Sequence, residues 1–212
     1  MIIRSLVVLA CLSATLFFVR SALMTDTEAR PIPDNLAIAT FAGGCFWCIE
    51  SDFEKSAGVA KAISGYSGGK KKDPSYRQVS SGATEHLESV EVHYDPAILS
   101  YEALLQAFWR MIDPTDPGGQ FSDRGYQYST AIFYHTEEQR IAAEKSLKSL
   151  DASGRYDKPI VTQIRRVGIF YPAESHHQDY YRHNPLRYRV YRWNSGRDQF
   201  LKTAWGEETL HK

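Results

Sequence analysis

The chain has 212 residues, of which 43% are hydrophobic and 24% charged, so it has the composition of a globular protein and is not disordered throughout. Its 25 basic residues balance its 25 acidic residues, which argues against nucleic acid as the main partner. Three cysteines are too few for a disulfide framework.

The N-terminus differs from the rest of the chain. Arg4 precedes an apolar run over 6–19 that is interrupted only by Ser13 and Thr15. A positive charge before an apolar run of this length is typical of a signal peptide, whereas a membrane-spanning helix needs about 20 apolar residues. We expect residues 1–23 to be a signal peptide or a membrane anchor, with a buried helix as the alternative. An exported protein, periplasmic or tethered to the membrane, would follow; a cytoplasmic protein is the alternative.

The remaining chain divides into three predicted parts. Residues 24–35 are polar and contain two prolines, which is typical of a linker. A folded domain is expected over 36–185, with a tail over 186–212. Arginines alternate with aromatic residues in this tail, so we expect a solvated face or a strap over the domain.

Hydrophobic periodicity and turn residues predict the elements of the domain. In chain order they are a strand over 36–41, a helix over 45–54, a strand over 59–66, a helical turn over 76–80, a strand over 88–94, a helix over 100–111, a strand over 128–134, a helix over 136–150, a strand over 160–170 and a short helix over 174–183. The helices are few and the connections irregular. This pattern predicts an α+β fold, a two-layer sandwich with a ferredoxin-like core in which a mixed β-sheet carries helices mostly on one face.

The motif GGCFWC over 43–48 follows a predicted strand and opens a predicted helix. Its glycines permit a tight turn, and the first backbone N–H groups of a helix have no partner within the helix. A thiolate there is stabilised by the helix dipole, so we expect a lowered pKa for Cys45. Cys48 lies one turn further along, where modest unwinding would allow a reversible disulfide.

The cysteine pair also admits three alternative hypotheses. The first is that the pair forms half of a zinc site, but the sequence has no second pair of cysteines, and the histidine pair His176 and His177 is distant in the sequence. A structural disulfide over so short a loop would stabilise weakly. A thioredoxin-like oxidoreductase does not explain the bulky Phe46 and Trp47, which fit better as walls of an apolar pocket.

With Glu50, the motif resembles the active-site motif of the A-type peptide methionine sulfoxide reductases. Further motifs follow in that family's order: GYSGG at 65–69, DPSY at 73–76, EHLE at 85–88, YDP at 94–96, DPT at 113–115, DRGYQY at 123–128 and FYxAExxHQxY at 170–180. The resemblance covers residues 37–185 and is highly specific in combination. It implies that 36–185 is the catalytic domain of an enzyme that reduces methionine S-sulfoxide, free or in proteins, to methionine.

The resemblance also implies catalytic roles. Cys45 attacks the sulfoxide sulfur and is left as a sulfenic acid, and Glu88 protonates the departing oxygen. Tyr76 and Tyr128 donate hydrogen bonds to that oxygen. The strand pattern agrees for Glu88, which shares the parity of Val90, so it should face the apolar side, where burial raises a carboxyl pKa.

Binding roles are implied for four more residues. Phe46 and Trp47 would hold the substrate methyl group, Asp123 would bind the substrate backbone, and Tyr180 would line the site. His86 has the parity of Glu88, and we expect it to support the site from behind.

Regeneration of the enzyme is expected to use Cys48. Many members of the family carry further cysteines in a C-terminal tail, but residues 186–212 contain none. Cys48 is therefore the resolving candidate, forming a disulfide with Cys45 that a thioredoxin-type dithiol reduces. No metal or cofactor is expected, and we expect a monomer. Two departures from the family pattern, Glu85 in place of a frequent glycine and Tyr126 in place of a smaller residue, could shift substrate preference.

Two further functions remain open on the sequence alone. One is a general dithiol–disulfide oxidoreductase, and the second is a non-catalytic metal-binding or redox-sensing module. Three measurements distinguish these functions. Consumption of methionine sulfoxide with dithiothreitol supports the reductase, reduction of insulin disulfides without sulfoxide consumption supports the general oxidoreductase, and stoichiometric zinc supports the metal-binding module.

Overall fold

The computed structural model describes residues 35–206, all within one compact unit. The expected signal peptide or anchor and all but the last residue of the expected linker lie outside the described residues. Between residues 35 and 206, no helix combines the length and apolar character needed to cross a membrane.

Seventeen elements follow one another along the described chain. They are β1 (Ala37–Gly43), α2 (Phe46–Phe53), β2 (Val59–Ser67), α3 (Tyr76–Ser80), β3 (Leu87–Tyr94), α4 (Tyr101–Trp109), β4 (Gly119–Gln120), β5 (Asp123–Arg124), the 3₁₀ helix η1 (Tyr126–Tyr128), β6 (Thr130–Tyr134), α5 (Glu137–Ala152), β7 (Gln163–Arg166), β8 (Tyr171–Pro172), the 3₁₀ helix η2 (Ser175–His177), α6 (Tyr180–His183), α7 (Pro185–Ser195) and α8 (Arg197–Trp205).

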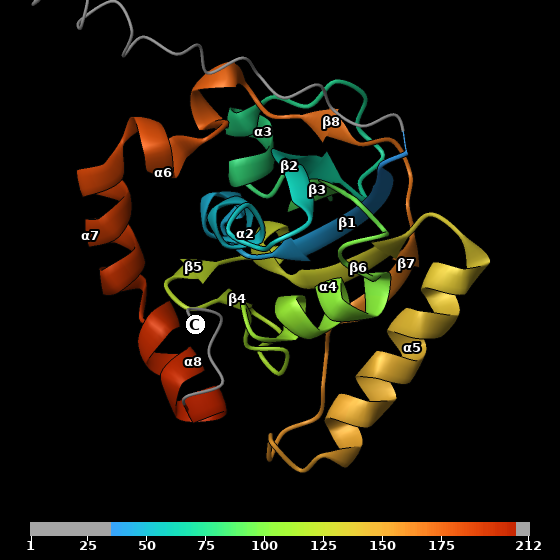
Figure 1. Cartoon of the computed structure of the whole chain (residues 1–212). Coiled ribbons are helices and arrows are strands. Elements are labelled where there is room, and N and C mark those ends of the chain that lie inside the picture. The colour runs from blue at the N-terminus through green and yellow to red at the C-terminus, as the bar shows by residue number, and fades with distance from the viewer. Residues whose placement is uncertain (1–34, 207–212) are drawn as a thin grey trace, which may run out of the picture. The chain divides into compact units, whose positions relative to one another are not determined.

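A six-stranded sheet forms the centre of the fold, in the order β7-β6-β1-β3-β2-β8 (Figure 1). Neighbouring strands are antiparallel except β6 and β7, which are parallel. This mixed sheet confirms the predicted α+β class. The register places Glu88 of β3 opposite Tyr66 of β2, and so brings the predicted acid into the middle of the sheet.

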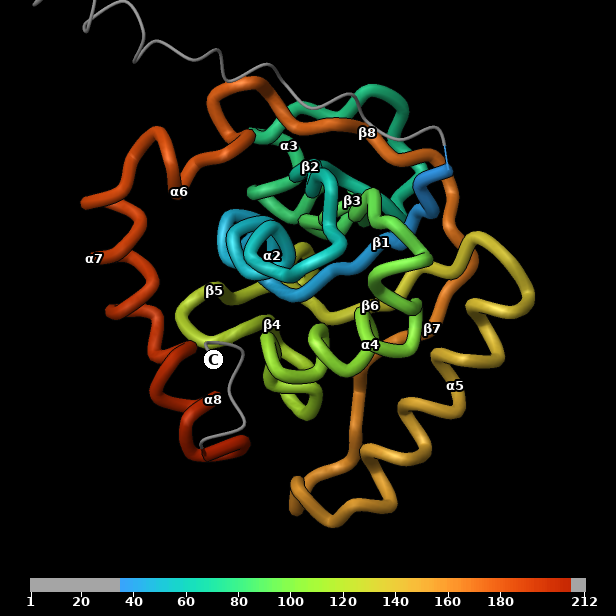
Figure 2. Tube along the Cα trace, in the orientation of Figure 1, coloured from blue at the N-terminus to red at the C-terminus, as the bar shows by residue number. Residues whose placement is uncertain are grey.

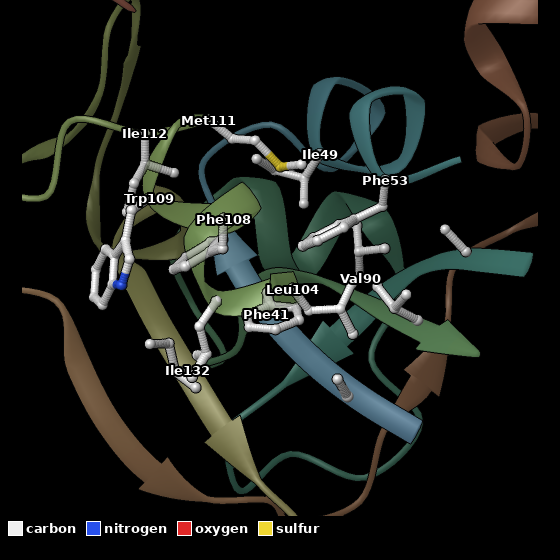
Figure 3. Packing of buried hydrophobic residues seen from close by; sticks show 14 of the residues in the cluster. Phe41, Ile49, Phe53, Val90, Leu104, Phe108, Trp109, Met111, Ile112 and Ile132 are labelled. Carbon is white, nitrogen blue, oxygen red and sulfur yellow. The ribbon is translucent and has the colours of Figure 1, made fainter. Parts of the chain in front are cut away.

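The main core lies on one face of this sheet. Phe41 of β1 packs between Phe53 of α2 and Phe108 of α4, with ring centroids 5.0 and 4.9 Å apart (Figure 3). Fully burying one such ring stabilises the fold by about 1.5–3 kcal/mol. Helices α2, α4, α5 and α8 all contribute to this cluster, which confirms that the helices lie mostly on one face.

The helix starts follow the sequence closely. Ser100 caps α4 by accepting a hydrogen bond from the Ala103 amide at 3.2 Å, and Thr136 caps α5 by accepting one from the Gln139 amide at 3.3 Å. A side-chain cap satisfies one of the N–H groups that have no partner within the helix. Local chemistry therefore determines where these two helices begin.

Two predicted elements differ in the structure. The strand expected over 160–170 is paired only over β7, and the chain then continues to the short β8. The helix expected over 174–183 is split into η2 and α6, because Asp179 takes a left-handed conformation with φ 51°. The first departure arises because β7 and β8 lie at opposite edges of the sheet, so the chain between them has to cross from one edge to the other.

The boundary expected at residue 185 is wrong as an end of the folded domain. Residues 185–205 form α7, which bonds to α2 through Arg192 and Asp52, and α8, which lies near β4 and β5 (Figure 2). Leu201 and Trp205 belong to the main core, and Arg192 is buried with its Nη1 donating to Asp52 of α2 at 2.7 Å. The arginines that suggested a solvated tail include two that are buried because α2 and the turn before it supply their partners.

Candidate active site

Two glycines turn the chain sharply from β1 into α2. A Cβ on Gly44, which has φ 83°, would lie 2.5 Å from Gln120 Cβ. A Cβ on Gly43 would lie 2.6 Å from Ile49 Cδ1. Only glycine fits this backbone conformation and this close packing. The turn places Cys45 at the N-cap of α2, with its thiol at the helix end.

A small cavity opens at this helix end. Its volume is about 170 Å³, and its lining residues are Cys45, Phe46, Trp47, Tyr76, Glu88, Asp123, Tyr128 and Tyr191. Seven of these were predicted as site residues, from segments spread over some 80 positions of the sequence. The fold thus brings the predicted nucleophile, acid and two hydroxyl donors around one space.

Glu88 lines the cavity and is 2% exposed. Its Oε2 accepts a hydrogen bond from the Phe46 amide, the first of α2, at 3.0 Å. Burial raises the pKa of Glu88 to about 8, against the effect of that hydrogen bond, and the charge of Asp123 adds to the increase. The carboxyl group is therefore largely protonated at neutral pH.

The two cysteines are free thiols that contact each other at the start of α2. Burial and the hydrogen bond with Cys48 raise the pKa of Cys45, so the expected lowering is wrong for the substrate-free protein. The same hydrogen bond and the charges of Arg197 and Arg192 lower the pKa of Cys48 to about 7, against burial. Cys45 is therefore held as the thiol, and Cys48 is the cysteine of the pair that ionises first.

The two predicted hydroxyl donors are held as neutral phenols. Burial raises the pKa of Tyr76 to about 12 and raises that of Tyr128 as well. Glu174 fixes the position of Tyr76, since its Oε1 accepts from the Tyr76 amide at 2.8 Å and its Oε2 from the Tyr66 hydroxyl at 2.7 Å. Neutral hydroxyls can donate to a developing negative charge without ionising themselves.

An aromatic stack forms one wall of the site. Trp47 stacks on Tyr180 with ring centroids 3.7 Å apart and an interplanar angle of 7°. Its indole Nε1 donates to His177 Nδ1 at 3.2 Å, and burial lowers the pKa of His177 to about 4, so that ring is neutral and can accept. Tyr180 does not line the cavity itself, and instead supports Trp47 from behind.

His86 lies outside the cavity and braces a loop. Its Nδ1 accepts from the Gly69 amide at 3.1 Å, and its Nε2 lies 2.8 Å from the Lys71 carbonyl oxygen. The preceding residue, Glu85, has φ 58°, which explains why glycine is frequent at this position in the family that the motif resembles. This position is consistent with a supporting role for His86, which does not line the cavity.

One lining residue was missed from the sequence. Tyr191 of α7 donates its hydroxyl to Asp123 Oδ2. Burial raises the pKa of Asp123, and the bond from Tyr191 opposes this increase. The sequence gives no clear signal for it, because the buried face of α7 consists of Tyr188, Arg192 and Ser195, which is not an apolar stripe. Among residues 35–206, no group of three or more metal-ligating side chains is arranged to hold a metal ion.

Comparison with known proteins adds independent evidence. A model of the peptide methionine sulfoxide reductase family matches residues 37–209. The peptide methionine sulfoxide reductase MsrA of Bacillus licheniformis is 51% identical over 171 residues, which cover 81% of this chain and 94% of that protein. The MsrA of Halalkalibacterium halodurans is also 51% identical, over 82% of this chain and 98% of that protein.

Solved structures resemble the chain in the same way. Reduced Mxr1 from Saccharomyces cerevisiae has a TM-score of 0.68 at 31% identity, over 73% of this chain and 88% of that one. Methionine sulfoxide reductase A of Corynebacterium diphtheriae has a TM-score of 0.65 at 31% identity, over 73% of this chain and 77% of that one. The matched range extends to residue 209, so it includes the helices α7 and α8.

Proposed function

The chain belongs to the peptide methionine sulfoxide reductase family, and we propose that Cys45 and Glu88 carry out its reaction. The reaction is the thiol-dependent reduction of methionine S-sulfoxide to methionine. One observation carries the assignment of these two residues. Both line one small cavity, where Glu88 is buried and holds its proton at neutral pH.

The first step joins sulfur to sulfur. The Cys45 Sγ attacks the sulfoxide sulfur while Glu88 gives a proton to the departing oxygen, and hydrogen bonds from Tyr76 and Tyr128 stabilise the charge on that oxygen. The Cys45 proton has an acceptor in Cys48, to which its thiol is hydrogen-bonded. The protonated oxygen passes to Cys45 Sγ as the bond between the two sulfurs breaks, so methionine leaves and Cys45 remains as a sulfenic acid.

The substrate is held by the groups around Cys45. Phe46 and Trp47 form the apolar wall that suits the substrate methyl group, supported by Tyr180. Asp123, oriented by Tyr191, is the acceptor available for a backbone N–H of the substrate. The cavity opens to solvent, so both free and protein-bound methionine sulfoxide are proposed as substrates.

The second step regenerates the enzyme. Cys48 attacks the Cys45 sulfenic acid, water leaves, and a Cys45–Cys48 disulfide forms. A thioredoxin-type dithiol then reduces this disulfide, and the chain needs no bound cofactor. The contact between the two thiols supports this step, and we propose that one monomer completes it.

Two substitutions test the roles of the cysteines. Cys45→Ser should release no methionine. Cys48→Ser should release about one methionine per enzyme and then stall with thioredoxin as the reductant. Methionine is measured by chromatography in a rapid-quench experiment, with dithiothreitol as a second reductant. Undiminished steady-state turnover of Cys48→Ser with thioredoxin would refute the resolving role.

We also propose that the protein is exported and works in the periplasm or tethered to the membrane. The charged and apolar pattern of residues 1–23 supports this location. Cell fractionation with N-terminal sequencing tests it. A mature N-terminus after residue 20 in the periplasm, or an intact one in the membrane fraction, is expected, and an intact Met1 in the cytosol would contradict the proposal.

A further inference from the structure

The two thiols of the pair differ in access. Cys45 lines the cavity and is 6% exposed, whereas Cys48 is 0% exposed and lines no part of it. In thiol–disulfide exchange the attacking thiolate must reach one sulfur in line with the bond, and the other sulfur leaves as a thiolate. The cavity therefore offers an incoming thiol the sulfur of Cys45.

Arg197, the first residue of α8, packs against the segment that precedes this pair. It is 1% exposed, its Nη2 donates to the Gly43 carbonyl oxygen at 3.0 Å, and its Nη1 donates to the Met111 carbonyl oxygen. A Cβ atom placed on Gly44 would lie 3.2 Å from the Arg197 Nη2. The guanidinium thus rests against the turn that immediately precedes Cys45.

This cation has no acidic partner in the described part of the chain. None of the ion pairs among residues 35–206 includes Arg197, and its buried Nε has no hydrogen-bond partner. Arg192, by contrast, is paired with Asp52 and Asp198. A buried charge without a counter-charge is costly, so Arg197 favours any negative charge that forms close to it.

Two acidic groups, the thiol of Cys48 and the carboxyl group of Asp123, are close enough for the charge of Arg197 to lower their pKa values. Asp123 already accepts a hydrogen bond from Tyr191, whereas the Cys48 sulfur becomes anionic when the disulfide opens away from it. Asp52, one turn beyond Cys48 on α2, opposes that anion but is itself neutralised by Arg192.

We propose that the reducing dithiol attacks the Cys45 sulfur of the disulfide, and that Arg197 stabilises the Cys48 thiolate that leaves. The inference rests on the proposed disulfide. The donor thiolate forms a bond to Cys45 Sγ, the Sγ–Sγ bond breaks, and the electron pair stays on Cys48. The second donor thiol then attacks the donor sulfur of this mixed disulfide, which oxidises the donor and releases Cys45.

The site of attack is tested by trapping the mixed disulfide. The unmodified protein is oxidised with one equivalent of methionine sulfoxide and mixed with a bacterial thioredoxin whose second active-site cysteine is replaced by serine. Free thiols are alkylated, and the complex is digested and analysed by mass spectrometry. Thioredoxin on Cys45 with alkylated Cys48 is expected. Thioredoxin on Cys48 would overturn the proposed direction.

The role of Arg197 is tested by removing its charge. In Arg197→Met the rate constant for disulfide reduction by thioredoxin should fall about tenfold. Arg197→Lys should recover part of that loss, and Arg187→Met, which removes an exposed arginine of α7, should change nothing. An unchanged rate constant in Arg197→Met would overturn the inference about Arg197.

A second measurement distinguishes an effect of the Arg197 charge on Cys48 from an effect of Arg197 on the structure of the turn before Cys45. In the Cys45→Ser background, the thiolate absorbance of Cys48 at about 240 nm should appear at lower pH than that of an ordinary cysteine, near 8.5. Adding Arg197→Met should move it to higher pH. If Arg197→Met does not fold, an ordinary cysteine titration in Cys45→Ser with Arg197 intact still overturns the proposal. Methionine released in the first turnover reports separately on the proposed function.

Discussion

The start of α2 and the helices α7 and α8 build the same site from opposite ends of the sequence. The segment 43–48 carries both sulfurs and two aromatic walls within six neighbouring positions. Arg192 lies 140 residues after Asp52, to which it is hydrogen-bonded, and Arg197 lies 154 residues after its partner Gly43. The reactive atoms are thus local to one motif, whereas the charges that act on them arrive from a distant segment.

The difference shows what each region contributes. Glycines, a helix end and two cysteines can be recognised wherever they occur together, because their chemistry depends on spacing. The buried arginines acquire their effect only from their surroundings, because a guanidinium in water would have little influence on a thiol. Four substitutions or conditions separate the two contributions.

The largest effect should come from Glu88, which lines the cavity. Glu88→Gln keeps the hydrogen-bond geometry but removes the transferable proton, so kcat should fall about 10²–10⁴-fold. In the unmodified enzyme, activity should decrease as the pH rises through about 8, where Glu88 loses its proton. Steady-state rates between pH 6 and 9 measure both effects. A high-pH decrease that persists unchanged in Glu88→Gln would assign it to another group.

A large effect on stability should come from the C-terminal helices. Arg192→Met leaves Asp52 buried with only Lys55 at 3.8 Å, so the free energy of unfolding should fall by about 3 kcal/mol. The matched control is Arg124→Met, which breaks the partly exposed ion pair with Asp116 and should cost less than about 1 kcal/mol. Urea unfolding measures both. Equal losses would show that α7 is held mainly by its apolar contacts.

The contribution of two buried carboxyl groups to the stability of the domain should fall as the pH rises from about 4.5 to 8. Glu88 and Glu50 have pKa values raised to about 8 and about 7 from an ordinary 4.5, mainly by burial, so the native state keeps protons that the unfolded chain releases. Their stabilisation is complete below about pH 4.5 and is lost through this range, by at least about 2 kcal/mol in total. Urea unfolding at pH 5, 6.5 and 8 checks this. Glu88→Gln should flatten the slope, and an unaltered slope would contradict the assignment to Glu88.

The smallest effect should come from Tyr191, where the two regions meet. Tyr191→Phe removes the hydrogen bond to Asp123, so kcat/KM for a sulfoxide peptide should fall about tenfold. The control Tyr181→Phe removes a hydroxyl that donates to Glu54, away from the cavity, and should leave kcat/KM unchanged. Similar losses in both variants would mean that the tyrosines act through the packing of the C-terminal segment.

Local patterns in the sequence were sufficient for much of the fold and for most of the cavity. The alternation over 88–94 predicted the face of Glu88, and Ser100 and Thr136 predicted two helix starts, because these signals act between residues close in the chain. The family motifs indicated seven of the eight lining residues, all except Tyr191.

Further properties were decided only by the tertiary structure. Whether Cys45 is ionised depends on its burial and on Cys48, and the acid of the site, Glu88, is bonded to the first amide of α2 from 42 positions away. The same holds for Tyr191 and Arg197, which resembled residues of a solvated tail until α7 and α8 were seen packed against the rest of the domain. The sequence determines which groups are present and which local elements they form. Their pKa values and contacts depend on which distant groups the fold places around them, since burial and charge act through space.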